Sequence, residues 1–226
     1  MKTILKSAIV VVLVLITASV ISAQDLSRYR KFALGTSVEA LLKQTGQNAR
    51  EVSVSHQSPA LIQEITLWPV DSSYSSSSVN RDPVLEIAFS FYNGTLYRMA
   101  VTYDRFSMEG LTEDDLVNAI SLRYGTGRRF YPEINLETPD AIESTDEVIA
   151  RWDNSRNSVT LIQSNSMNSF KLLVLSKQVE AQAKTAITSA VKLERDEAPQ
   201  KEMDRQSQEA IDLEAARQKN LTTFRP

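Results

Sequence analysis

The stretch VLEIAFSFYNGTLYRMAVTYD (residues 84–104) decides the fold. It predicts two β-strands, residues 84–91 and 95–104, because apolar side chains alternate with other residues on both sides of Asn93-Gly94. Four side chains share one face of each strand: Leu85, Ile87, Phe89 and Phe91 on the first, and Tyr97, Met99, Val101 and Tyr103 on the second. The expected structure is a hairpin.

The loop length sets the register of this hairpin. A two-residue loop would pair Phe89 with Arg98 and place the two apolar sets on opposite faces. A three-residue loop, residues 92–94 with Gly94 left-handed, pairs Phe89 with Tyr97 and places both sets on one face. We therefore predict the three-residue loop.

Two helices are expected, and each has a capping pattern at its start. Thr36 with Glu39 predicts a helix over residues 36–45, and Thr112 with Asp115 predicts one over residues 112–124. Their buried stripes are Val38, Leu41 and Leu42 in the first, and Leu116, Val117, Ile120 and Tyr124 in the second.

The two halves of the chain share a pattern. Gly-x-[Ser/Thr]-x-[Asp/Glu]-x-Leu begins at Gly35 and again at Gly110. Strand-like runs follow near residues 50–55, 60–68, 84–91 and 95–104, and then near 128–131, 146–152, 158–163 and 169–175. In each half the second run ends in Ile-x-x-Trp, and we expect Trp68 and Trp152 to be core or interface anchors. The prediction is an α+β domain, residues 24–175. It consists of two helix-plus-antiparallel-sheet units in tandem, about 30–104 and 105–175, followed by a C-terminal helical tail.

The run Phe32-x-x-Gly35-Thr-Ser-Val-Glu-x-Leu41, continuing to Gly46, resembles the BamE/SmpA-type envelope domain. A tandem of such units is similar to the β-lactamase inhibitor protein family. The resemblance implies one or two helices packed on an antiparallel sheet, and a function in binding other proteins. The chain lacks the lipidated cysteine of the first family and the disulfides of the second, and no binding residue is carried over.

The first 23 residues, MKTILKSAIVVVLVLITASVISA, have the pattern of a secretory signal peptide. Lys2 and Lys6 precede an uncharged apolar run, and residues 21–23 form a small-residue cleavage site, so the mature chain would begin near Gln24. The alternative is an uncleaved membrane anchor, the one case in which we expect membrane association. The charge-free stretch of residues 7–23 is shorter than the roughly 20 residues of a spanning helix, so we expect cleavage.

The chain contains no cysteine, which excludes disulfides and a lipidated cysteine. A cysteine-free exported chain of this size is typical of bacterial periplasmic or secreted proteins. Without Lys2 and Lys6, 23 of the 25 basic residues remain against 28 acidic ones, a net charge of −5. This balance argues against a nucleic-acid partner, because phosphate binding needs a basic stripe.

The segment after residue 175 differs from the rest. Residues 176–226 contain no glycine, and 18 of the 51 are charged, nine of each sign. An apolar stripe predicts a helix over residues 177–194: Val179, Ala183, Ala186, Ala190 and Leu193, widened by Ile187 and Val191. Glu180 and Lys184 form a helical charge pair, and Pro199 interrupts the helix before a more polar one, residues 200–217. The tail is either a polar helix that leaves the domain or a docking arm, coiled-coil-like over two heptads, for a partner or a second copy.

Catalytic and metal-binding patterns are sparse. His56, the one histidine, is expected in a surface turn. A zinc site is not expected, because one histidine and no cysteine thiolates are available as ligands. Residues 153–157 place oxygen ligands at calcium-loop positions, but Ser158 replaces the required glycine, so a turn between strands is favoured. Arg128-Arg129 beside Phe130 and Tyr131 is the one basic-aromatic cluster, and the favoured interpretation is a strand start with solvated arginines.

These patterns favour a non-catalytic exported protein that acts by protein–protein contact in the cell envelope or outside the cell. No cofactor or metal is expected. A first candidate surface includes Tyr74, from the serine-rich loop of residues 71–83, with Arg128 and Tyr131; a second is the tail stripe at Val179, Ala186 and Leu193, for a protein partner or self-association. The alternatives are an exported hydrolase with paired carboxylates, and a small-ligand carrier with an apolar cavity between helix and sheet.

Overall fold

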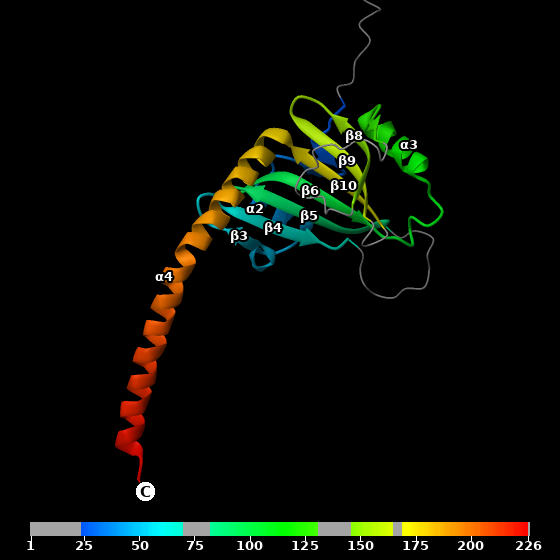
Figure 1. Ribbon diagram of the computed structural model, residues 1–226. Helices are drawn as coiled ribbons and strands as arrows, with labels where there is room; N and C mark the ends of the chain where they lie inside the picture. The colour runs from blue at the N-terminus through cyan, green and yellow to red at the C-terminus, as the bar shows by residue number, and fades with distance from the viewer. Residues whose placement is uncertain (1–23, 70–81, 131–145, 165–168, 226) are drawn as a thin grey trace, which may run out of the picture.

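The computed structural model describes residues 24–69, 82–130, 146–164 and 169–225. Within these ranges the chain is α+β, as predicted, with a large antiparallel sheet between helices (Figure 1). The elements in chain order are β1 (Arg28–Tyr29), β2 (Phe32–Ala33), α2 (Val38–Thr45), the 3-10 helix η1 (Ala49–Glu51), β3 (Ser53–His56), β4 (Ile62–Leu67), β5 (Val84–Tyr92), β6 (Thr95–Tyr103), α3 (Glu113–Tyr124), β7 (Arg128–Arg129), β8 (Glu147–Asp153), β9 (Asn157–Ser164), β10 (Ser169–Ser176) and α4 (Lys177–Thr223). The expected signal peptide, residues 1–23, lies outside the described residues.

The large sheet has the strand order β3-β4-β5-β6-β10-β9-β8-β7, and every neighbouring pair is antiparallel. All eight predicted strand-like runs are present in it. Strands β3 to β6 progress from one edge to the centre, and β7 to β10 progress from the other edge to the centre. The two series meet where Val101 of β6 pairs with Leu172 of β10.

The β5–β6 hairpin does not use the predicted three-residue loop. Asn93 and Gly94 alone form the turn, with φ of 48° and 77°, and Tyr92 pairs with Thr95. Asn-Gly accepts positive φ at both positions, and such a two-residue turn matches the twist of the strands. Gly94 is left-handed, as expected.

A bulge at Tyr97 brings the apolar side chains of β5 and β6 to the same face of the sheet. Phe91 pairs with Leu96 and Ser90 pairs with Arg98, so Tyr97 is the extra residue. Beyond the bulge Phe89 pairs with Met99, not with Tyr97 as predicted, and the main apolar sets still share one face. Tyr97 itself packs on the opposite face of the sheet.

A second register shift, between Val84 and Glu86, changes the start of β5. Leu85 was expected on the core face with Ile87, but it is exposed, and Val84 is fully buried in its place. Alternation alone misses this change because a one-residue shift moves a side chain to the other face.

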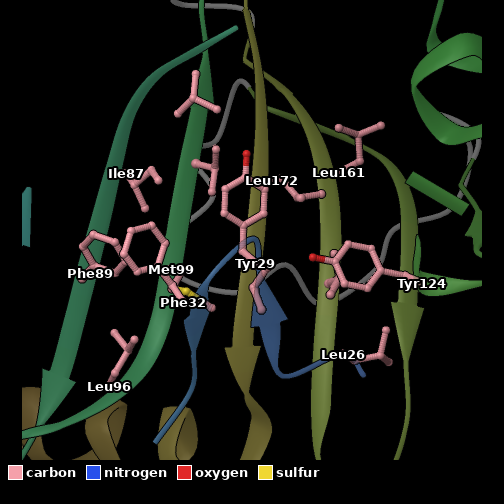
Figure 2. Packing of buried hydrophobic residues seen from close by; sticks show 14 of the residues in the cluster. Leu26, Tyr29, Phe32, Ile87, Phe89, Leu96, Met99, Tyr124, Leu161 and Leu172 are labelled. Carbon is pink, nitrogen blue, oxygen red and sulfur yellow. The ribbon is translucent and has the colours of Figure 1, made fainter. Parts of the chain in front are cut away.

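The main core lies between the sheet and a layer formed by the N-terminal segment, α2 and α3. Phe32 from β2 meets Phe89 edge-to-face with ring centroids 4.9 Å apart. Tyr29 lies near Phe32, and Leu26 belongs to the same core on the side of Tyr124 (Figure 2). α2 and α3 contribute Val38, Leu41, Val117 and Tyr124. The Tyr124 hydroxyl donates to the Arg28 carbonyl at 2.7 Å and joins α3 to β1.

The helix caps agree with the sequence in one case and differ in the other. Thr112 and Asp115 form the predicted capping box of α3. The cap of α2 is Ser37, which accepts from the Ala40 amide, not the predicted Thr36. The Thr36 hydroxyl donates instead to the Ala33 carbonyl at 2.7 Å.

The two tryptophans differ, although both were expected to be anchors. Trp152 is buried, and its Nε1 donates to the Gly125 carbonyl at 2.7 Å. Gly127 lies so close to this indole that a Cβ there would come within 2.5 Å of it. Trp68 is 60% exposed at the end of β4 and is not part of the core.

Candidate functional site

The most distinctive feature of the molecule is α4, which crosses one end of the sheet and then continues far beyond it (Figure 1). The helix is continuous from Lys177 to Thr223, so the predicted break at Pro199 is wrong. A proline inside a helix costs about 3 kcal/mol. An ion pair between Lys201 and Glu197, at 2.8 Å, spans the proline and supports the helix there.

The first four turns of α4 pack on the sheet face opposite the main core. Ala183, Ala186 and Ala190 are buried, because their small side chains let the helix lie close to the strands. Ala183 shares a cluster with Ile62 and Tyr97, and Val179 and Ile187 are half-buried against it. Two of the predicted partner-binding residues, Val179 and Ala186, thus contact the chain's own sheet.

A buried ion pair joins this part of α4 to the sheet. Arg98 Nε donates to Glu180 Oε2 at 3.0 Å, and Arg98 Nη2 donates to Oε1. Burial alone would lower the pKa of Arg98, but the hydrogen bonds and charge of Glu180 outweigh burial and leave the pKa raised. The sequence predicted a pair of Glu180 with Lys184 and did not predict Arg98. The position of Glu180 next to the apolar stripe of the helix could have indicated that this carboxylate needs a partner on the sheet.

A second contact holds α4 at the sheet edge. His56 Nδ1 lies 3.1 Å from Glu194 Oε1, four turns along the helix from Glu180. His56 is the last residue of β3, not a turn residue as expected, and its side chain is mostly covered. Sequence reasoning missed this contact because the two residues are 138 positions apart.

Beyond this contact the helix extends away from the sheet (Figure 1). Every residue from 191 to 225 is exposed, and the helical part of this segment is about 50 Å long. Large apolar side chains are exposed along it: Val191, Leu193, Met203, Ile211, Leu213, Leu221 and Phe224. Leu193, the third predicted tail residue, is therefore accessible.

Part of this exposed segment has an apolar stripe on one side. Met203, Ala210, Leu213 and Leu221 recur at helical spacing, with Gln206 and Arg217 in the same row, and Phe224 follows directly after the end of the helix. Ion pairs form within the helix: Arg205 pairs with Glu202 at 2.7 Å beside the stripe, and Arg217 in the row pairs with Glu214 at 3.2 Å. Such pairs between neighbouring turns stabilise an isolated helix.

An open groove of about 470 Å³ lies where α4 meets the sheet edge. Its walls are Pro59, Ala60 and Tyr92 on one side and Ala181, Gln182, Thr185, Ala186 and Ser189 on the other. The carrier alternative predicted an apolar cavity between helix and sheet; this groove lies at such a junction, but it is open and its wall includes the polar residues Gln182, Thr185 and Ser189.

Of the first candidate surface only Arg128 can be placed, since Tyr74 and Tyr131 lie outside the described residues. Arg128 is exposed on β7 and pairs in register with Arg151 of β8. The two guanidinium carbons lie 4.9 and 5.4 Å from the ring centroid of Phe130. Arg129 points the other way and pairs with Asp114 of α3.

The described residues contain no cluster of three or more histidine or acidic side chains that could hold a metal. Residues 153–157 form the polar turn between β8 and β9, as expected; there Asn154 Oδ1 accepts from the amides of Arg156 and Asn157. No helix in the described ranges has both the length and the apolar character to cross a membrane.

Comparison of the chain with protein-family models, with curated proteins and with solved structures finds no match.

Proposed function

We propose that this protein is exported and acts without catalysis, by binding another protein through the exposed part of α4. The segment from 191 to 225 is the binding element, and the sheet domain is the base that holds it. The first candidate surface, near Arg128, is secondary in this proposal.

A single observation carries the proposal: about 50 Å of continuous helix extends from the domain with its apolar side chains exposed. An isolated polar helix needs no large apolar side chains on its surface. Here Met203, Leu213, Leu221 and Phe224 expose more than half of their area on one side. An apolar stripe on a helix is the usual element for docking into a groove or against another helix.

The attachment of α4 supports a role as a positioned arm. Arg98 with Glu180 fixes the helix over the sheet, and His56 with Glu194 fixes it again near the edge. With two anchor points the direction of the exposed segment is set by the domain. A partner would therefore meet a helix that is already formed and oriented, which lowers the entropy lost on binding.

We also propose that the sheet domain is a tandem of two related units. The strand order supports this proposal, because each helix, α2 or α3, precedes four strands that progress from an edge of the sheet to its centre. The units differ in two respects: Trp68 is exposed whereas Trp152 is buried, and the first unit has an additional N-terminal hairpin, β1–β2. Superposing the two units as separate fragments tests the relation.

Export rests on the first 23 residues. Leu26, two positions after Gln24, is already buried in the core, so cleavage before Gln24 would leave the domain intact. The intact mass of the protein recovered from the cell envelope or medium tests this, since a mass that begins at Met1 contradicts cleavage.

The binding proposal is tested with the full mature chain carrying Leu213→Glu and Leu221→Glu. We expect these changes to abolish the native complex, whether with a different protein or with a second copy, as seen by sedimentation. Leu122→Glu is the matched control, because Leu122 is 92% exposed on α3. If the double variant sediments in the same complex as the control, α4 is not the binding element.

A further inference from the structure

The sheet face that carries α4 also carries an arginine whose donors are shielded from water without being hydrogen-bonded. Arg151 Nε and Nη2 are both buried, and neither has a partner among the described residues. A buried donor without an acceptor costs roughly 1–3 kcal/mol, and more when it is charged. The two atoms form one edge of the guanidinium, the edge that holds an oxyanion with two parallel hydrogen bonds.

Arg98, on the same face of the sheet, uses the same edge of its guanidinium to bind a carboxylate. Arg151 pairs with Thr160, which pairs with Leu173, which pairs with Ala100, two residues from Arg98. Both arginines therefore point to the same side of the sheet. Arg98 uses Nε and Nη2 to hold the carboxylate of Glu180.

The surroundings of Arg151 favour the binding of a negatively charged group. Arg128 lies directly opposite it on β7, and like charges in that position repel. Burial lowers the pKa of Arg151; the charge of Asp153 opposes this, and Arg128 adds a smaller lowering effect. The Asp153 carboxylate is itself paired with Lys177 at 2.8 Å.

A third donor lies on the other side of Arg151. Thr160 is 1% exposed, and its hydroxyl has no hydrogen-bond partner in the described chain. Since Thr160 is the cross-strand partner of Arg151, the hydroxyl and the guanidinium share one row of the sheet face.

We propose that Arg151, with Arg128 and Thr160, binds an oxyanion of the carboxylate or phosphate class. Two acceptor oxygens would meet Nε and Nη2 of Arg151, the Thr160 hydroxyl would donate to the same group, and Arg128 would supply the second positive charge. The site is independent of the binding role of α4.

The test uses the full mature chain and two probes, succinate and inorganic phosphate, each compared with sodium chloride at equal ionic strength. The variant is Arg151→Gln. The matched control is Arg156→Gln, an exposed arginine in the turn of the same β8–β9 hairpin. At a probe concentration ten times Kd, we expect the melting temperature of the unsubstituted chain and of the control to rise by about 2–4 °C.

The result expected for Arg151→Gln is no rise with either probe. An equal rise in all three proteins would be a general ionic effect and would overturn the proposal, as would no rise in the unsubstituted chain. The two probes distinguish the sources, because a rise with only one names the carboxylate or the phosphate. If Arg151→Gln does not fold, the nitrogen NMR signal of Arg151 Nε in the unsubstituted chain decides: it shifts with the probes, or the proposal fails.

Discussion

Arg98 Nε lies 3.0 Å from Oε2 of Glu180, and this contact joins the central strand β6 to the first turn of α4. The pair lies where the helix begins to cross the sheet, and Glu180 is only 5% exposed. Because the pair is buried, each charge depends on the other for its solvation. The direction of the helix therefore depends on this ion pair together with the contact of His56 with Glu194.

Removing one partner should be costly. We expect Glu180→Gln to lower the free energy of unfolding by about 3 kcal/mol, because Arg98 is left buried without its counter-charge. Replacing both residues with leucine should recover most of that loss, since no buried charge remains. Urea unfolding of Arg98→Leu, Glu180→Leu and the double leucine variant measures the coupling. Additive losses would mean that the two charges act independently.

The close approach of Gly127 to Trp152 gives a second test. We expect Gly127→Ala to destabilise the fold by about 1–3 kcal/mol, because its methyl group would overlap the indole ring. The same change in a Trp152→Leu background should cost much less, since the ring is gone. Thermal unfolding of the four proteins measures both costs, and equal costs in the two backgrounds would rule out the steric explanation.

Pro199 lies inside α4, and its replacement should strengthen the exposed helix. Pro199→Ala restores a backbone donor and removes a ring clash, worth about 3 kcal/mol of local helix stability. The stability of the sheet should not change, because the residues around Pro199 are exposed. Hydrogen exchange should show slower exchange at residues 195–203 and unchanged exchange in β6. Unaltered exchange on both sides of position 199 would mean that the helix is already interrupted there.

The contact of Asp82 with Arg30 gives a pH dependence with a defined sign. Two hydrogen bonds from Arg30, at 2.6 and 2.8 Å, lower the pKa of Asp82 in the folded state. The unfolded chain therefore binds the proton more readily, and the contribution to stability is present above about pH 4 and is lost as the pH falls through the lowered value.

Asp82→Asn should remove this contribution at neutral pH, by up to about 1 kcal/mol for a partly exposed pair. The difference between the variant and the unsubstituted chain should vanish in acid, as measured by urea unfolding from pH 7 to pH 2. Asp196→Asn, on the exposed part of α4, is the matched control. A gap that persists at pH 2 would assign the effect to packing and not to charge.

The strands could be predicted from the sequence because alternation and Asn-Gly turns are local. The same local reasoning failed at Tyr97 and Leu85, where bulges move one residue to the other face. Local reasoning also predicted a helix break at Pro199. Helix propensity alone does not include the ion pair between Lys201 and Glu197, which stabilises the helix on both sides of the proline. The anchors of α4 were missed since Arg98 with Glu180, and His56 with Glu194, join residues far apart in the chain.

The central claim, that the exposed part of α4 binds a protein, is tested most directly by site-specific photo-crosslinking in intact cells. In one variant a photoreactive residue replaces Leu213, which is 73% exposed on the stripe. In a control variant of the same chain it replaces Leu122 on α3. We expect one discrete adduct from position 213, to a different protein or to a second copy, and none from position 122. No adduct from position 213, or the same adduct from both positions, would contradict the claim.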